Sequence, residues 1–163
     1  LCRSYLFFYY QRKLDKGDRE MVREFQADDL SRIMKLWLDT NIQAHDFIKK
    51  SYWQDHFGEV MEILPKASVY VYEDNGSIQG FIGLMDSYIA GIFISKDHQS
   101  RGIGSRLLHY VKGNHDELSL KVYEKNKRAL DFYKREGFVV TEKQEDKENG
   151  EVEYQMAWSR NWA

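Results

Sequence analysis

Cysteine and proline are almost absent from this sequence of 163 residues, which has one of each. The single cysteine, Cys2, cannot form an internal disulfide, and a metal site built from cysteines is excluded as well. Its place near the terminus does not suit a catalytic nucleophile. The five histidines include no H-x-x-x-H pair, so we expect neither a zinc site nor any other bound metal.

A charge excess of either sign is lacking too. The chain has 24 basic and 26 acidic residues, a formal net charge of −2 at pH 7 and a pI near 6.2. We therefore expect no nucleic acid and no membrane surface as the main partner, because both are anionic and attract strongly basic proteins. A chain of this length with 31% charged and 15% aromatic residues is typical of one globular domain.

The N-terminal segment, residues 1–20, differs from the rest of the chain. Its apolar run from Tyr5 to Tyr10 is too short to span a bilayer, and no small-residue cleavage site succeeds it, so we expect no signal peptide. The sequence MVREFQADDL, which begins at Met21, resembles the natural N-terminus of a protein, with a methionine, a short strand and the entry to a helix. We expect residues 1–20 to be an extension outside the native domain and residues 21–163 to form one domain; an extra N-terminal strand or arm is the alternative. With neither signal nor anchor, we expect a cytoplasmic, bacterial protein.

Apolar spacing and turn residues predict elements in the order β-α-α-β-β-β-α-β-α-β-β. Strands are expected at 22–25, at 68–87 as a pair joined by an Asn75–Gly76 turn, at 88–95, at 118–124 and in a final hairpin around Asn149–Gly150. Helices are expected from a cap at Asp28 or Asp29 to a loop near Asn41, and at 47–64, 102–112 and 127–136. This order predicts a mixed α/β fold of the α+β type, a largely antiparallel sheet with helices on both faces.

A loop with two glycines, Gly102-Ile103-Gly104, comes after the expected strand at 88–95 and opens a helix. A dinucleotide-binding fingerprint needs a small residue three positions after the second glycine, where this chain has Leu107, and no Gly-Lys-Ser/Thr P-loop occurs. The N–H groups and positive dipole end of the helix start still favour a phosphate or pyrophosphate, with Arg101 and Arg106 as added charges. The alternative is a helix entry whose glycines only permit the turn.

The sequence VYEKNKRALDFYKREGF, residues 122–138, adds a second motif. It places Asn126 at a helix start, with Ala129 and Tyr133 one and two turns along, before Gly137–Phe138. A Q-x-x-G-x-G loop after an apolar strand, followed by N-x-x-A-x-x-F-Y-x-x-x-G-F, resembles the GNAT superfamily of acyl-CoA-dependent N-acetyltransferases. The resemblance extends to the order of elements, and it implies a sheet of about seven strands.

The resemblance implies an enzyme, an acetyltransferase with acetyl-CoA as co-substrate and no metal. In the family, the glycine loop's amides hold the coenzyme pyrophosphate, the preceding strand pairs with the pantetheine arm, and an asparagine matching Asn126 contacts the coenzyme. The tyrosine matching Tyr133 protonates the departing thiolate, a suitable task for a phenol with a pKa of about 10; core packing is the alternative. Residues implied in coenzyme binding are Ile92, Phe93, Ile94, Gln99, Ser100, Arg101, Gly102, Ile103, Gly104, Ser105 and Asn126.

Direct transfer in a ternary complex needs a neutral amine, and a lysine-like amine with a pKa of about 10.4 is protonated at pH 7. A general base, acting through water, is therefore expected. Some protein-acetylating members of the family carry a glutamate five residues before the asparagine, where this chain has Lys121. The candidates for the base are Asp86, Glu124 and His45, and an ordinary surface or capping role is the alternative for each.

In the family the acceptor binds beside the first two helices, here LWLDTNIQAHDFIKKSYWQDHF, residues 36–57. The candidates for an aromatic pocket that binds a cationic amine are Trp37, His45, Phe47, Tyr52 and Trp53. Core packing is the alternative for Trp37 and Phe47. The sequence leaves open whether the acceptor is a small amine, a protein lysine or a protein N-terminus, and whether the chain is a monomer or a homodimer. A non-catalytic coenzyme A-binding sensor or interaction module is the second functional hypothesis.

Overall fold

The structure, a computed structural model, describes residues 20–162; the expected extension, apart from its last residue Glu20, lies outside the described residues. Seven strands form one sheet in the order β1-β2-β3-β4-β5-β7-β6. All neighbours are antiparallel except β4 and β5, so the predicted mixed, largely antiparallel sheet is confirmed. The strands are β1 (Glu20–Glu24), β2 (Ser68–Asp74), β3 (Ser77–Met85), β4 (Tyr88–Ile94), β5 (Glu117–Tyr123), β6 (Val139–Asp146) and β7 (Glu151–Ser159).

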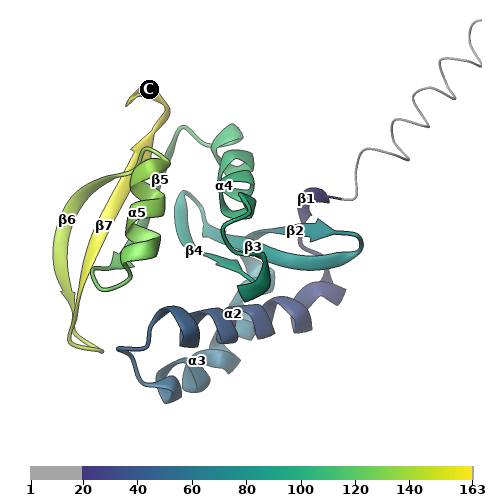
Figure 1. Cartoon of the computed structure of the whole chain (residues 1–163), viewed down its shortest axis with the longest axis horizontal. Coiled ribbons are helices and arrows are strands. Elements are labelled where there is room, and N and C mark those ends of the chain that lie inside the picture. Colours follow the sequence, from purple (N-terminus) through teal and green to yellow (C-terminus); the bar gives the residue numbers. More distant parts are fainter. Residues whose placement is uncertain (1–19, 163) are drawn as a thin grey trace, which may run out of the picture.

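Helices cover both faces of the sheet, with α2 and α3 on one side and α4 and α5 on the other (Figure 1). The helices are α2 (Leu30–Ala44), α3 (Lys50–Ile63), α4 (Ile103–Gly113) and α5 (Lys127–Arg135). Short 3-10 turns are η1 (Ala27–Asp29), η2 (Leu64–Lys66), η3 (Lys96–His98) and η4 (Arg160–Trp162). Within residues 20–162, none of the helices has the length and apolar character needed to cross a membrane.

Each face of the sheet has its own apolar core, because side chains alternate along a strand. The core on the α4–α5 face includes Leu107, Leu108 and Val111 of α4 with Leu118, Leu120 and Val122 of β5. The core on the α2–α3 face includes Ile33, Met34 and Trp37 of α2 with Val69, Val71 and Phe81. The alternate residues of β5, Ser119, Lys121 and Tyr123, therefore lie on the α2–α3 side of the sheet.

The end of the first helix differs from the prediction. The prediction of a loop near Asn41 is wrong, because α2 continues to Ala44 and residues 45–49 connect it to α3. Asn41 is buried, and its Nδ2 donates to the Trp37 carbonyl 2.9 Å away, one turn earlier. This bond keeps its polar group satisfied inside the helix, where asparagine otherwise favours turns. The next helix begins at Lys50 rather than residue 47.

Both predicted hairpins are present. Asn75 and Gly76 have φ angles of 51° and 76°, as the central residues of a two-residue primed turn require. The final hairpin closes through residues 147–150, between the paired residues Asp146 and Glu151, and Gly150 has φ of 67°.

The sheet opens between β4 and β5. Only Tyr88 with Ser119 and Ile89 with Leu120 pair across these parallel strands. The register of β3 against β4 shifts at the same point and leaves Ala90 as an extra residue on β4. Beyond this bulge, and counting the strands of residues 20–162, β4 pairs only with β3, so a gap opens between β4 and β5 in the middle of the sheet.

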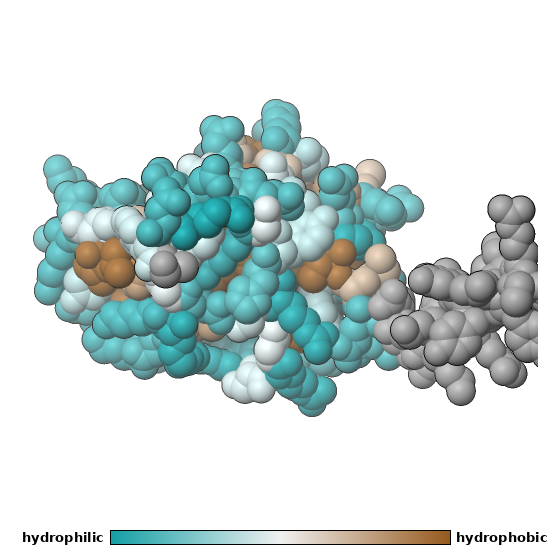
Figure 2. All heavy atoms as spheres, turned by 90° about the horizontal axis from the view of Figure 1, so that it is seen from above, coloured by the Kyte–Doolittle hydropathy of each residue, from teal (hydrophilic) through white to brown (hydrophobic). Residues whose placement is uncertain are grey.

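The face of the molecule seen in Figure 2 is mainly hydrophilic, with small separate apolar patches. The exposed large apolar side chains of the described residues are Met21, Met61, Ile63, Met85, Tyr88, Tyr110, Val139, Val140 and Trp162. Scattered apolar residues of this kind are ordinary on a protein surface.

Candidate active site

Left-handed residues shape the loop between β4 and α4. Ser100 has φ of 61°, and Gly102, the N-cap of α4, has φ of 80°. Alternation of left- and right-handed residues turns successive N–H groups to one side of the chain, which forms a concavity suited to an anion. A side chain at position 102 would be strained in this conformation, so the backbone itself requires glycine there.

The N–H groups of residues 100–105 have no hydrogen-bond acceptor among the described residues. The N–H of Arg106 makes the first bond of the helix, to the Gly102 carbonyl 3.1 Å away. Free N–H groups at the positive dipole end of an eleven-residue helix form an anion site. The residues of this loop therefore fit a pyrophosphate group.

Arg128 of α5 is a cation beside this loop that the sequence motifs did not identify. Its guanidinium donates to Gln99 Oε1 at 2.5 Å and to Ser100 Oγ at 3.0 Å. Gln99 Nε2 in turn donates to the Ile94 carbonyl at 3.0 Å. The side chain of Gln99 thus holds the loop to the end of β4. Arg128 could not be identified from the sequence, because its place beside the loop depends on the position of the N-terminus of α5 in the fold.

Two residues of the glycine motif have contacts away from the concavity. Arg106, expected to add charge to the loop, instead pairs with Glu20 and donates to Tyr72 Oη at 2.9 Å. A Cβ added at Gly104 would lie 3.2 Å from Cζ of Phe132. Glycine at position 104 therefore allows α4 to pack closely on α5, in addition to any role toward a ligand.

Apart from the Ile94 carbonyl, which accepts from Gln99, one backbone edge of residues Ile92–Ile94 has no hydrogen-bond partner within residues 20–162. Their other edge pairs with β3, and Ile92 and Ile94 pack on the α4–α5 core. Phe93 points to the opposite face and stacks on Phe81, with ring centroids 4.7 Å apart. An extended molecule carrying amide groups can pair with such an edge as an added strand would.

Tyr133 of α5 lies in the core of the α4–α5 face, with its ring against Phe132 and Phe138. Burial, and secondarily the charge of a nearby Tyr88, raises the pKa of Tyr133 above its usual value. Its hydroxyl makes no hydrogen bond with any residue in the range 20–162. The phenol stays protonated at neutral pH and is free to donate.

Asn126, the N-cap of α5, connects two layers of the molecule. Its Oδ1 accepts the Ala129 N–H at 3.2 Å, and its Nδ2 lies 3.2 Å from Nε2 of His45. The other ring nitrogen of His45 lies 3.1 Å from the Asn41 carbonyl at the end of α2. Burial lowers the pKa of His45, so the ring is neutral at pH 7.

The expected aromatic pocket residues do gather. His45 stacks on Trp53, with centroids 5.1 Å apart, and meets the edge of Phe47 at 5.7 Å. Trp53 in turn contacts Tyr52 at 4.9 Å and Trp37 at 6.0 Å. Trp37 is 8% exposed and belongs to the core, whereas Tyr52 lies at the surface side of the cluster. Trp53, at 9% exposed, belongs to the core as well, so the partly exposed His45, Phe47 and Tyr52 are the residues placed to meet a ligand.

Tyr123 at the end of β5 belongs to the same cluster and was not singled out from the sequence. Its ring meets His45 at 5.4 Å and Phe47 at 5.6 Å, edge to face. Its hydroxyl donates to Oδ2 of Asp146 at 2.6 Å. Burial and this carboxylate raise the pKa of Tyr123. The alternating apolar and polar residues of LSLKVYE could have identified it, because side chains alternate along a strand and Tyr123 therefore lies on the face opposite Val122.

The three candidates for the general base lie in different surroundings. Asp86 occupies the exposed turn between β3 and β4, with φ of 54°. Glu124 accepts from Tyr154 Oη at 2.5 Å and from Lys143 Nζ at 3.2 Å, and both bonds lower its pKa. The Nε2 lone pair of His45 already accepts a bond from Asn126. These contacts weaken Glu124 and His45 as bases.

Glu153 of β7 is a carboxylate that the sequence motifs did not single out. It pairs with Tyr123 of β5 and so shares the α2–α3 side of the sheet. Its Oε1 accepts from Gln144 Nε2 at 2.7 Å and lies 3.5 Å from Nζ of Lys121. Burial and the charge of Glu153 raise the pKa of Tyr88, the first residue of β4. Strand pairing, which the sequence does not reveal, brings Glu153 to this place.

Further acidic groups line the tip of the β6–β7 hairpin. Tyr52 Oη donates to Glu148 at 3.4 Å, and Lys125 pairs with Glu151 at 2.9 Å. Glu153 likewise pairs with Lys121, whereas Asp146 and Glu148 have no lysine or arginine partner among the described residues. Asp146 and Glu148 are therefore the carboxylates here that are open to a cationic ligand.

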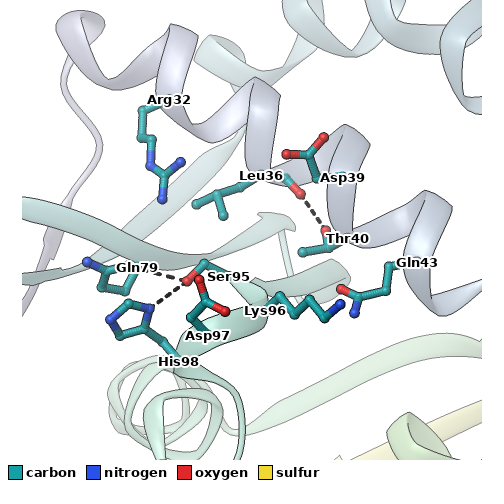
Figure 3. A pocket seen from close by; sticks show the side chains of 10 residues that line it. All are labelled: Arg32, Leu36, Asp39, Thr40, Gln43, Gln79, Ser95, Lys96, Asp97 and His98. Carbon is teal, nitrogen blue, oxygen red and sulfur yellow. Dashed lines mark hydrogen bonds between the residues drawn. The ribbon is translucent and has the colours of Figure 1, made fainter.

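A separate cavity of about 500 Å³ lies between α2 and the ends of β3 and β4 (Figure 3). In it, Ser95 Oγ bonds Gln79 Oε1 at 3.3 Å and His98 Nδ1 at 2.8 Å. The lining residues are Arg32, Leu36, Asp39, Thr40, Gln43, Gln79, Ser95, Lys96, Asp97 and His98. Its lining has charges of both signs and includes none of the residues expected at the active site.

Comparison with protein families matches residues 36–160 to the acetyltransferase (GNAT) domain. Among known proteins, the chain is 37% identical over 124 residues to the peptidyl-lysine N-acetyltransferase YiaC of Escherichia coli (strain K12). That match covers 75% of this chain and 85% of the relative.

Solved structures agree on the fold. The solution structure of apo-form YjaB from Escherichia coli has a TM-score of 0.75 and 25% identity, covering 85% of this chain and 97% of that one. Spermidine N-acetyltransferase from Vibrio cholerae, crystallised in complex with CoA and spermine, has a TM-score of 0.69 and 20% identity, covering 88% and 96%. The second likeness concerns the fold alone.

Proposed function

This chain belongs to the GNAT family of acetyltransferases, as the motifs predicted, and we propose that it transfers the acetyl group of acetyl-CoA directly to the ε-amine of a protein lysine. The observation that carries the proposal is the gap between β4 and β5. Free loop amides lie at one end of the gap, Tyr133 lies on its α5 side, and the acidic and aromatic cluster lies on its α2–α3 side. Donor and acceptor can therefore meet in a ternary complex.

The donor site is proposed at the loop and the free edge of β4. The N–H groups of residues 100–105 would hold the pyrophosphate, with Arg101 and Arg128 as the nearby cations. The backbone of residues 92–94 would pair with the pantetheine amides, and Asn126 would donate to the coenzyme. When bound, acetyl-CoA supplies a thioester whose carbonyl carbon accepts the amine and whose sulfur leaves.

Tyr133 is proposed as the general acid. Its hydroxyl has no hydrogen-bond acceptor among the described residues and stays protonated at pH 7, because burial raises its pKa. A thiolate released into the same apolar surroundings is desolvated as well, which raises the pKa of that thiol too. The proton donor and acceptor therefore remain matched, as general acid catalysis requires.

Glu153 is proposed as the general base, acting through a water molecule. It would take up the proton that the acceptor ammonium loses before attack and pass it to solvent. The C–N bond then forms as the C–S bond breaks, and Tyr133 gives its proton to sulfur. The second proton that the acylated nitrogen loses returns through water to the Tyr133 oxygen, which leaves a neutral amide, a free thiol and the phenol as it was. Glu153 suits this role because it lies on the acceptor side and its charge is felt at Tyr88, next to Tyr133. Asp86, on its exposed turn, is the alternative.

The acceptor is proposed to be a lysine side chain. Its ammonium suits the carboxylates at the β6–β7 tip, and its alkyl chain suits the partly exposed rings of His45, Phe47 and Tyr52. The family relative YiaC acts on peptidyl lysine, at 37% identity. A small polyamine would offer the same ammonium group, so the two acceptor classes must be separated by experiment.

The test is an assay of coenzyme A thiol release with matched acceptors. We expect turnover with an N-terminally blocked peptide that contains lysine, and slower turnover with a lysine-free peptide that has a free N-terminus and with spermidine. Faster turnover with either of the latter would show that the lysine assignment is wrong. Coenzyme binding without turnover of any acceptor would instead support the non-catalytic sensor.

A further inference from the structure

We propose that His45 is a positioning residue for the donor, which holds the carboxamide of Asn126 in the orientation that binds the coenzyme. This inference rests on the proposed function, since it takes Asn126 as a coenzyme ligand. It assigns His45 to donor binding, although His45 lies in the loop between the acceptor-side helices α2 and α3. His45 would act through Asn126 and not on the reacting atoms.

The hydrogen bonds around Asn126 determine which way its amide points. The Ala129 N–H can only be accepted by Oδ1, and this bond caps α5. Nδ2 is therefore the group that faces His45, at 3.2 Å. Since Nδ2 is a donor, Nε2 of His45 must accept, and the ring proton must lie on Nδ1, which donates to the Asn41 carbonyl at 3.1 Å.

This arrangement leaves one N–H of Asn126 available. Oδ1 caps the helix and one N–H of Nδ2 bonds His45, so the second N–H of Nδ2 is the only donor left for a ligand. Without the bond to His45, the carboxamide would be held by Oδ1 alone and could rotate about its last torsion, whose preference is broad. Fixing that torsion in advance lowers the entropy lost on binding the coenzyme.

Packing keeps His45 itself in place. Trp53 stacks on one side of the ring, and Phe47 and Tyr123 meet it edge to face. The chain of bonds from the Asn41 carbonyl through His45 to Asn126 connects the end of α2 with the start of α5. These helices cover opposite faces of the sheet, so the chain spans the β4–β5 gap at its open end.

The bond to Asn126 requires a neutral imidazole. Protonation would put an N–H on Nε2, facing the N–H of Nδ2, and the two donors would repel. Of the ionisable groups in the aromatic cluster, Tyr123 meets the ring at 5.4 Å and donates to Asp146, and Lys125 has its ammonium over the neighbouring Phe47 ring. Coenzyme binding should therefore weaken in mild acid, and the loss should depend on the imidazole.

The test measures the dissociation constant of coenzyme A by titration calorimetry, with no acceptor present. His45→Phe keeps a ring against Trp53 but cannot accept a hydrogen bond, whereas His45→Gln keeps an acceptor. We expect His45→Phe to weaken binding about fivefold, as for the loss of one modest hydrogen bond, and His45→Gln to restore most of it. His109→Gln on exposed α4 is the matched histidine control and should bind as the wild type does.

A double-mutant cycle with Asn126→Ala separates positioning from packing. If His45 acts through Asn126, the double variant binds coenzyme A no more weakly than Asn126→Ala alone, and the wild-type affinity falls from pH 7.5 to pH 5.5 more than that of His45→Gln. The proposal would be overturned if the losses of coenzyme A affinity in the two single variants added up in the double variant, or if His45→Phe bound coenzyme A as tightly as the wild type. Failure of the folded wild type to bind coenzyme A would overturn the proposed function itself, which is a different result.

Discussion

The ammonium nitrogen of Lys121 lies 3.5 Å from Oε1 of Glu153, across the neighbouring strands β5 and β7. The side chain of Glu153 is 14% exposed and that of Lys121 is 43% exposed, so the carboxylate is the more enclosed partner. Gln144 donates to the same oxygen. A second ammonium, on an acceptor lysine, would find here a carboxyl group that Gln144 and Lys121 already hold in place.

Glu153→Gln should lower kcat for a lysine peptide by about 10²-fold, the usual contribution of a general base, and leave coenzyme A affinity unchanged. The glutamine can still bond Gln144, so the fold should persist. Steady-state kinetics at pH 7.5 measure the effect, and Glu145→Gln on exposed β6 is the matched control. Equal kcat in the two variants would remove Glu153 from the mechanism.

Gly102→Ala should destabilise the protein by about 1 kcal/mol, because an alanine is strained in the left-handed conformation. The same change should weaken coenzyme A binding, since the loop amides would shift. Gly113→Ala, at the last residue of α4 with open space around it and no positive φ, should instead stabilise by about 0.5 kcal/mol. Urea unfolding compares the two; a Gly102→Ala variant as stable as the wild type would contradict the assigned role of the loop backbone.

Arg128→Gln should raise the dissociation constant of coenzyme A by about two- to fivefold, the range of an exposed charge contact. The dependence of binding on salt should also decrease, because one cation near the pyrophosphate is lost. Arg135→Gln, on the same helix and also exposed, is the control. The assignment fails if both variants bind alike at low and high salt.

Protonation of His45 should also reduce stability in mild acid. Its pKa in the folded protein is below the ordinary 6.5, because burial disfavours the charged ring. Above pH 6.5 the ring is neutral in both states; below it the unfolded chain takes up a proton that the folded chain resists, so the free energy of unfolding falls as pH falls. Urea unfolding from pH 7.5 to 5.5 should show a smaller decline for His45→Gln than for the wild type.

Local signals in the sequence were enough for the fold and for the donor loop. Asn75–Gly76 predicts its hairpin because few residues adopt two successive left-handed conformations. The order of elements and the glycine and asparagine motifs are local patterns of the same kind. The loop predicted at Asn41 was wrong because the side chain of Asn41 donates to a carbonyl of its own helix. That bond depends on the burial of Asn41 and not on the neighbouring sequence.

Contacts between distant residues could not be predicted in this way. Asn126 and His45 are 81 positions apart, and Arg128 meets Gln99 across 29 positions. Glu153 reaches the α2–α3 side because of the register of β7 against β5, and a shift by one residue would turn it to the other face. The sequence identified most of the residue types involved but not which of them meet.

Acetylation of a lysine peptide by Tyr133→Phe is the decisive measurement for the proposed mechanism. The hydroxyl makes no hydrogen bond within residues 20–162 and phenylalanine fills the same space, so stability and coenzyme A affinity should match those of the wild type. The rate of coenzyme A thiol release at saturating substrates should fall by about 10²-fold, as for the loss of a general acid. A folded variant that binds coenzyme A and turns over at the wild-type rate would contradict the mechanism.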